Sequence, residues 1–206
     1  PATRRAIKTV SSATPPLLFM SLTMTDLGTN LLAIARNAIA VRLGQGKTAI
    51  AVDAPELHKN AATFITLTQN GQLRGCIGSL QAYRPLVDDI RENACNAAFR
   101  DPRFKPLSAN ELPITRVEVS LLTPAEAMQF SSEADALAQL RPNIDGIIFS
   151  AGNHRSTFLP QVWEQLPDPV DFMAHLKLKA GLPATYWDSD VKLERYTVKK
   201  WKEETP

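Results

Sequence analysis

The sequence is poor in the residues from which most metal sites and thiol-based catalytic sites are built. It has two cysteines, Cys76 and Cys95, and three histidines, His58, His154 and His175. The cysteines form no Cys-x-x-Cys pair, and their spacing matches neither a zinc site nor the disulfide framework of a small secreted domain. We therefore predict no metal and no cofactor. So few thiols favour a reducing, cytoplasmic location.

Long apolar runs and a strong excess of one charge are also missing. No uninterrupted apolar stretch approaches the ~20 residues of a membrane-spanning helix, so we expect no membrane insertion. The formal net charge is +2, and Arg4, Arg5 and Lys8 all precede the first acidic residue, Asp26. The rest of the chain is therefore slightly acidic. Because nucleic-acid binding needs a concentrated basic face, the composition argues against such a partner.

The 206 residues, 44% of them hydrophobic, are enough for one folded domain or two small ones. Residues 1–25 are rich in Ser, Thr and Pro and contain no acid, which suits either a transit peptide or an extended start of the chain. We expect these residues to form a disordered extension. The folded domain is predicted over residues 26–200, with residues 201–206 as a tail.

Hydrophobic periodicity predicts helices separated by hairpins. Apolar stripes indicate helices that begin near Leu27, at Pro85 and after Asp168. Asn70-Gly71 is typical of a two-residue turn, because both positions need positive φ, and it pairs residues 63–68 with 73–80. Further strands are predicted at 116–122, 147–150, 155–158 and 191–198. With no regular βαβ repeat, this order predicts an α+β fold, in which helices flank a mainly antiparallel sheet in two layers.

The most informative local feature is the segment Leu73–Ser79, in which a thiol stands between two glycines. Side chains alternate along a strand, so Arg74, Cys76 and Gly78 are predicted to share one face and Leu73 the other. Glycine in a strand is typical of a bulge or of a place where another group approaches the backbone closely. We therefore predict a ligand site at Arg74, Gly75 and Gly78, with Cys76 as candidate nucleophile.

The chemistry of this candidate site leaves two interpretations open. A neighbouring cation favours the thiolate, and a free backbone N–H beside a glycine can hold an oxyanion. A lone cysteine in a strand is otherwise a small buried hydrophobe, which is our interpretation of Cys95. Cysteine catalysis also needs a base. His58, in a loop before the hairpin of Asn70-Gly71, is the candidate base.

Two arginines in predicted loops complete the candidate ligand site. Arg103 lies in a proline-framed loop and Arg155 in the second hairpin, and loops carry function more often than core segments do. The structural alternative is that these arginines pair with Asp101 or Asp145. Both interpretations stay open at this point.

Five segments of the chain match the signature of a known family. They are Arg74-Gly75-Cys76-Ile77-Gly78, Asp101-Pro102-Arg103-Phe104, Glu118-Val119-Ser120-Leu121, Thr157-Phe158-Leu159-Pro160-Gln161-Val162-Trp163 and Lys179-Ala180-Gly181-Leu182. From Leu27 to about Tyr196 the chain resembles the AMMECR domain family. The resemblance implies two subdomains with the glycine-cysteine signature near a cleft, and a family with no established activity. Family association with Memo-like and radical-SAM proteins suggests a shared modification pathway.

Three hypotheses for function follow from these observations. The first is that a cleft at the Arg74–Gly78 signature binds a small or extended anionic ligand and uses Cys76. The second is a non-enzymatic adaptor, in which the glycines only permit close packing and an exposed face recruits a protein. The third is a component of an RNA-modification pathway, whose binding would depend strongly on salt.

Overall fold

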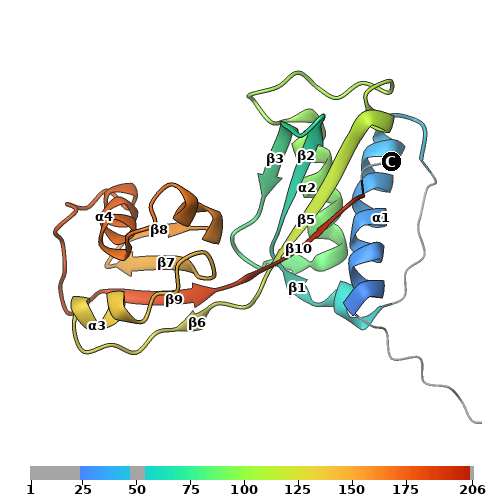
Figure 1. Ribbon diagram of the computed structural model, residues 1–206. Coiled ribbons are helices and arrows are strands. Elements are labelled where there is room, and N and C mark those ends of the chain that lie inside the picture. The colour runs from blue at the N-terminus through green and yellow to red at the C-terminus, as the bar shows by residue number, and fades with distance from the viewer. Residues whose placement is uncertain (1–23, 47–53, 205–206) are drawn as a thin grey trace, which may run out of the picture.

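The computed structural model describes residues 24–46 and 54–204, and these form two lobes (Figure 1). Residues 1–23 of the predicted extension lie outside the described residues, and the first helix already begins at Met24. We call residues 24–46, 54–122 and 198–204 the large lobe and residues 126–196 the small lobe. Within the described part of the chain, no helix is both long enough and apolar enough to cross a membrane.

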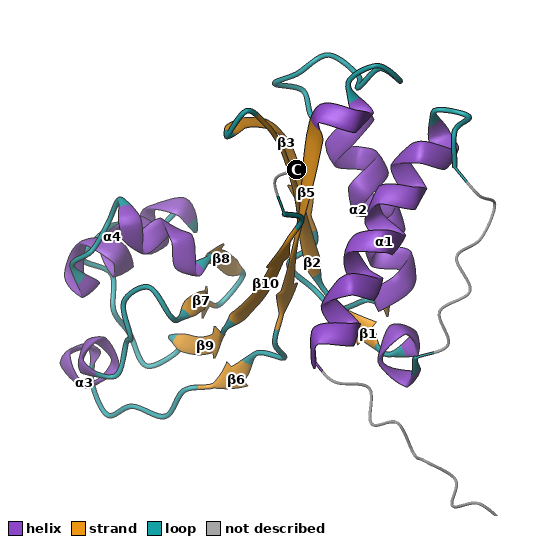
Figure 2. Ribbon diagram, turned by 45° about the vertical axis from the view of Figure 1, so that its right-hand side comes forward, coloured by secondary structure: helices purple, strands orange, loops and turns teal. Residues whose placement is uncertain are grey.

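The large lobe is an antiparallel sheet with two helices on one face (Figure 2). The sheet order is β10-β5-β2-β3, and a short β1–β4 pair stands apart. Ile65 and Leu67 of the sheet pack against Ile34 and Ile90 of the helices, and each such buried side chain contributes roughly 1.5–3 kcal/mol. The elements are α1 (Met24–Arg42), η1 (Pro55–His58), β1 (Asn60–Ala61), β2 (Thr63–Gln69), β3 (Gln72–Gly78), β4 (Arg84–Pro85), α2 (Leu86–Phe99), η2 (Leu112–Ile114), β5 (Thr115–Leu122) and β10 (Val198–Lys202).

The small lobe has its own antiparallel sheet, of order β6-β9-β7-β8. The Asp168 carboxylate accepts hydrogen bonds from the first free N–H groups of α4, and Pro169 has the φ of a first helical turn, which explains why this helix begins there. Trp163 and Phe172 stack at 3.7 Å in its core. The elements are β6 (Glu126–Ala127), α3 (Glu133–Ala138), β7 (Gly146–Ala151), β8 (His154–Phe158), η3 (Pro160–Glu164), α4 (Pro169–Lys179) and β9 (Lys192–Tyr196).

Two chain crossings and one apolar cluster join the lobes. Thr123 donates its N–H to the carbonyl of Thr197, whose own N–H is donated to the Thr123 hydroxyl. Beside these crossings, Ala62 and Leu122 of the large lobe bury against Ile148 and Tyr196 of the small lobe. The helix-free face of the large sheet is therefore turned toward the small lobe, and a cleft separates the two where they do not touch.

The α+β prediction with two subdomains around a cleft is confirmed, whereas the end of the chain differs from the prediction. The strand expected at residues 191–198 is two strands, β9 and β10, which belong to different sheets. The tail predicted from residue 201 is also wrong as far as residue 204, because β10 runs to Lys202. Trp201 packs on the core, and Glu203 accepts hydrogen bonds from Arg36 at 2.5 Å and from the N–H of Val117 at 2.9 Å.

Candidate functional site

A β-bulge in the signature strand changes which residues face the cleft. Leu67 of β2 stands opposite Gly75, but the next residue, Thr68, stands opposite Leu73, so Arg74 is the extra residue. A bulge interrupts strict alternation, and Leu73 consequently lines the same hollow as Cys76. The predicted separation of Leu73 from Cys76 is wrong for this reason.

Arg74 does not line the hollow that contains the thiol. Its Nε donates to Glu111 Oε1 at 2.9 Å and its Nη2 to Oε2 at 3.3 Å, while its guanidinium lies 5.9 Å from the Phe104 ring centre. The Arg74 hydrogen bond, followed by that of the Ser108 N–H, lowers the pKa of Glu111 to about 2. Arg74 therefore ties the strand to the loop before β5.

Acid should weaken the ion pair between Arg74 and Glu111. Because the pKa of Glu111 is lower in the folded chain than its ordinary value of 4.5, its contribution to stability is present above about 4.5 and is lost as the pH falls toward about 2. We expect the free energy of unfolding of Glu111→Gln to fall less over this pH range than that of the wild type. Urea denaturation at several pH values measures both. Asp101 is unchanged in both proteins, so the difference between the curves isolates Glu111; parallel curves would contradict the assignment.

Both signature glycines are explained by packing inside the large lobe. A Cβ on Gly75 would lie 2.2 Å from the carbonyl oxygen of Ala97 in α2, on the buried face of the sheet. A Cβ on Gly78 would lie 2.3 Å from the ring of Phe64 and 2.5 Å from the carbonyl oxygen of Thr63. Gly75 thus faces away from the cleft, contrary to its predicted ligand contact, and Gly78 makes room for Phe64.

Cys76 is half-buried on the cleft side of β3, and its backbone is held from the loop after α2. Its N–H donates to Asp101 Oδ2 at 2.9 Å, and its carbonyl accepts from Arg103 Nη2 at 3.3 Å. The Sγ lies 3.4 Å from Thr66 Oγ1. Because the Cys76 N–H already has an acceptor, it is not free to hold an oxyanion.

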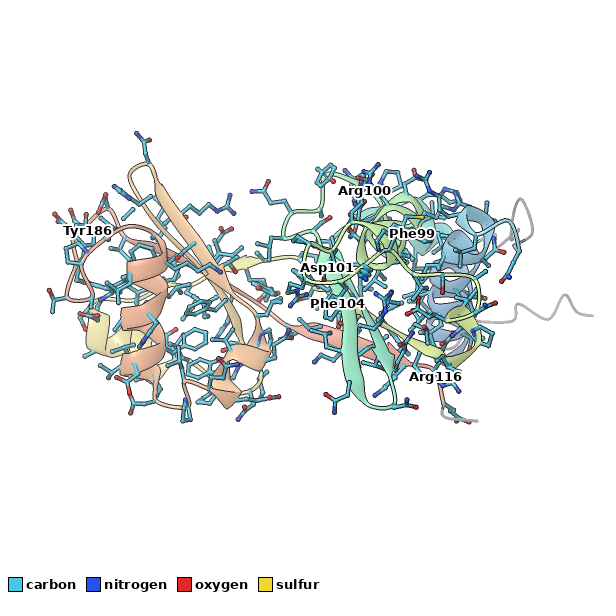
Figure 3. All side chains as sticks on the ribbon, turned by 90° about the horizontal axis from the view of Figure 1, so that it is seen from above. Phe99, Arg100, Asp101, Phe104, Arg116 and Tyr186 are labelled. Carbon is cyan, nitrogen blue, oxygen red and sulfur yellow. The ribbon has the colours of Figure 1, made fainter. Side chains whose placement is uncertain are left out.

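The Asp101–Arg103 pair fixes this arrangement beside β3. Asp101 is 3% exposed, and its Oδ2 accepts a hydrogen bond from Arg103 Nη2 at 2.6 Å. The Arg103 guanidinium holds the pKa of the Asp101 carboxyl far below its ordinary value. In Figure 3 the loop with Asp101 and Phe104 lies over the large lobe, while Tyr186 marks the outer part of the small lobe. The pairing of Arg103 with Asp101 that we left open is therefore present. About half of the Arg103 side chain is still exposed.

Cys76 lines a hollow of about 620 Å³ between the lobes, which we call the thiol groove. Four of the five family segments contribute to it, including Arg103, Glu118 and Gln161. Its lining residues are Phe64, Thr66, Leu73, Cys76, Arg103, Glu118, Ser120, Leu159, Gln161, Gln165, Val198 and Lys200. The strand register places Cys76, Thr66 and Glu118 on one row across three strands.

Several groups of the thiol groove were not predicted as site residues, although Glu118 and Gln161 stand in family segments. Glu118, Lys200 and Gln161 come from β5, β10 and η3, and nothing in their local sequence places them beside Cys76. The available signal was that Glu118 and Ser120 alternate with the core residues of β5 and so leave the buried face.

The remaining predicted site residues lie elsewhere. His58 is exposed on η1, which packs on α2, and it does not line the thiol groove. Arg155 lies on β8 with one nitrogen 3.8 Å from Glu194, and it lines a neighbouring hollow. Cys95 sits on α2 against the carbonyl of Ala38, and burial raises the pKa of its thiol. Among the described residues, no three His, Cys, Asp or Glu side chains gather as a metal site would require.

Fold and groove together define a two-lobed α+β protein with a polar cleft between its sheets. The family model AMMECR1 matches residues 32–201, and the chain belongs to this family. A protein of Methanothermobacter thermautotrophicus is 38% identical over 83% of this chain and 91% of its own length, and one of Methanocaldococcus jannaschii is 35% identical over 91% and 95%. The crystal structure of an uncharacterized protein from Pyrococcus horikoshii is similar at a TM-score of 0.72, with 34% identity, covering 87% and 92% of the two chains.

Proposed function

We propose that the thiol groove binds a small or extended anionic ligand in contact with Cys76. The observation that carries this proposal is the convergence of four separate family segments on one hollow between the lobes. A cleft with few, convergent polar groups among apolar ones is the usual form of a ligand site. Phe64, Leu73 and Leu159 supply apolar surface here, and the thiol, the two glutamines and the charged groups supply specificity.

The charges of the thiol groove support an anionic ligand that also carries a hydrogen-bond donor. Lys200 makes no ion pair with any described residue, so its charge is available to a ligand. Arg103 binds Asp101 but keeps half of its side chain in solvent. Glu118 lines the same hollow and favours an N–H or O–H group on the ligand.

Accessibility of the thiol tests the proposal. We expect iodoacetamide at pH 7.5 to alkylate Cys76 roughly tenfold faster than Cys95, because burial raises the pKa of the Cys95 thiol and only the thiolate reacts. Mass spectrometry of Cys76→Ser and Cys95→Ser variants assigns each rate to one thiol. Equal rates, or a faster Cys95, would remove the groove as an accessible site.

Covalent use of Cys76 is the further part of this proposal, and it needs a proton acceptor. Among the described residues that line the groove, Glu118 is the one carboxylate, with Thr66 between it and the thiol in the sheet. His58 is not near enough to line the groove. A ligand that binds equally to the wild type and to Cys76→Ser, and that leaves no adduct, would restrict Cys76 to a contact role.

The adaptor hypothesis has a separate observation in its favour. Leu80 and Tyr83, in the loop after β3, are 43% and 62% exposed and line the same hollow, and clustered exposed apolar side chains are typical of protein-binding surfaces. An adaptor for Memo-like or radical-SAM pathway proteins would bind its partner unchanged after Cys76→Ala. It would lose binding after Leu80→Ser with Tyr83→Ser. RNA binding would instead fall steeply with added salt.

A further inference from the structure

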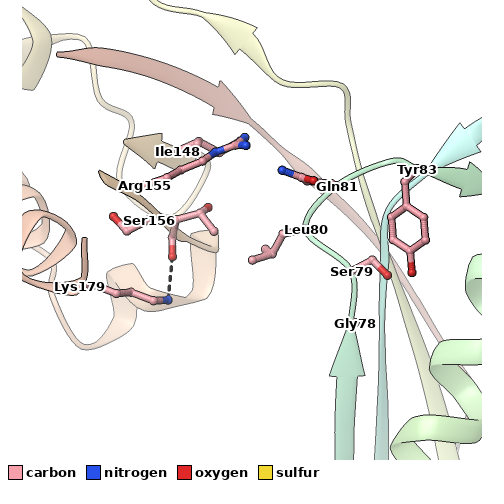
Figure 4. A pocket seen from close by; sticks show the side chains of 10 residues that line it. Gly78, Ser79, Leu80, Gln81, Tyr83, Ile148, Arg155, Ser156 and Lys179 are labelled. Carbon is pink, nitrogen blue, oxygen red and sulfur yellow. Dashed lines mark hydrogen bonds between the residues drawn. The ribbon is translucent and has the colours of Figure 1, made fainter. Parts of the chain in front are cut away.

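A second hollow, of about 570 Å³, continues the cleft beyond the end of β3 (Figure 4). We call it the basic hollow. Its polar lining comes from both lobes: Ser79, Gln81 and Tyr83 of the large lobe and Arg155, Ser156, Thr157 and Lys179 of the small lobe. Among the described residues, two cations and no carboxylate line this hollow, whereas one carboxylate lines the thiol groove. This hollow therefore has the more clearly positive lining.

The two cations of the basic hollow have donor groups to spare. Lys179 gives one hydrogen bond, to the carbonyl of Thr157 at 2.9 Å, and lies 4.9 Å from the ring centre of Phe158. An ammonium has three donors, so two remain. Arg155 approaches Glu194 only to 3.8 Å, beyond hydrogen-bond distance. In Figure 4, Arg155 reaches toward Gln81 across the hollow.

The large-lobe wall of the basic hollow is held in place by a buried carboxylate. The Ser79 hydroxyl donates to Asp89 Oδ1 at 2.7 Å, and Arg84 donates to the same oxygen at 2.8 Å. The Arg84 guanidinium also lies 4.8 Å from the centre of the Tyr83 ring. Because Asp89 is fully buried, this wall is fixed before any ligand arrives, which lowers the entropy cost of binding.

The basic hollow and the thiol groove follow one another along the same two walls. On one wall, Cys76 lines the groove and Gly78 the hollow; on the other, Leu159 lines the groove and Thr157 the hollow. A step of two residues along a strand is about 7 Å. One ligand of moderate length can therefore occupy both.

We infer that the basic hollow is the anion-recognition subsite of the cleft. It binds a phosphate or carboxylate group of the same ligand whose other part lies against Cys76, and this inference rests on the proposed function. Bidentate contact from Arg155 and a point charge from Lys179 suit either group. The ligand class is thus an extended molecule with a terminal anion.

An NMR titration of the full chain tests this subsite. Inorganic phosphate and acetate are added separately, and the backbone amide signals are followed in the wild type, in Arg155→Gln with Lys179→Gln, and in Lys192→Gln. Lys192 is an exposed small-lobe lysine that does not line either hollow, so it controls for loss of charge. We expect the largest shifts at residues 79–83 and 155–157, and at least fivefold weaker binding in the double variant alone. The anion that binds more tightly shows whether the subsite recognises a phosphate or a carboxylate group.

Shifts centred elsewhere, or equal affinity in the wild type and the double variant, would overturn the subsite. Cys76 alkylation in the presence of tripolyphosphate, an extended anion, separates this failure from failure of the proposed function. Slower alkylation in the wild type and in the double variant alike would uphold the proposed function and overturn the subsite. Phosphate binding at the basic hollow without any effect of tripolyphosphate on Cys76 would uphold an anion site there and overturn the proposed function.

Discussion

Replacing Asp89 with alanine is expected to lower the free energy of unfolding by about 4 kcal/mol, because the change removes the buried partner of Arg84 and leaves several buried hydrogen-bond donors without their acceptor. The Asp89 side chain is fully buried, and that of Arg84 is only 14% exposed. Asp89 also accepts hydrogen bonds from four further donors: the N–H and hydroxyl of Thr63 at 2.8 and 2.7 Å, the Ser79 hydroxyl and the Asn93 amide. Urea denaturation measures the change.

Asp88 provides the matched control for this prediction. It precedes Asp89 in α2, its side chain is 56% exposed, and it lies 3.6 Å from Arg91 across one helical turn. Exposed ion pairs of this kind contribute about 0–1 kcal/mol, so Asp88→Ala should change stability little. Similar losses for the two variants would show that the helix, and not the buried network, accounts for the effect.

Replacing Gly75 with alanine should lower the free energy of unfolding by about 3 kcal/mol. The new methyl group would meet the carbonyl oxygen of Ala97 at 2.2 Å, and that oxygen belongs to helix backbone, which cannot rotate away. Relief requires α2 to move from the sheet. Thermal or urea unfolding of the purified variant measures the loss.

Gly71→Ala separates this clash from the ordinary cost of replacing a glycine. Gly71 has a φ of +77° in the hairpin turn, and a Cβ there would meet nothing within 4 Å. Its replacement should therefore cost about 1–2 kcal/mol from backbone conformation alone. If Gly75→Ala were no worse than Gly71→Ala, close packing of β3 on α2 would not explain the signature glycine.

Much of the fold could be predicted because its signals are local. Asn70-Gly71 formed the expected turn, with φ of 49° and 77°, and Asp168-Pro169 began the expected helix. The split of the last strand could not be predicted, because Thr197 gives no local sign that the chain leaves one sheet and enters another. Its cause is long-range pairing, of Lys199 with Leu121 in the large lobe and of Arg195 with Ile147 in the small lobe.

The candidate site was predictable only in part. Cys76 and Arg103 do line one groove, whereas Arg74 turns to Glu111 because a single extra residue shifts the register. The strand glycines are typical of a bulge, but they do not specify that Arg74 is the extra residue. Glu118 and Lys200 are likewise brought to the thiol groove by sheet order, which a single sequence does not specify.

The proposed function requires that the thiol groove expose Cys76 to anions, with Lys200 as its unpaired cation among the described residues. The direct measurement is the rate of Cys76 alkylation by anionic iodoacetate divided by the rate with neutral iodoacetamide, at low salt. We expect Lys200→Gln to lower this ratio about twofold, since Lys200 lies three strands from Cys76 and a charge roughly 10 Å away in water contributes about 0.4 kcal/mol. Arg91→Gln, on α2 beyond the opposite face of the sheet, should leave it unchanged. A ratio that does not respond to Lys200, or that responds equally to Arg91, would contradict the account.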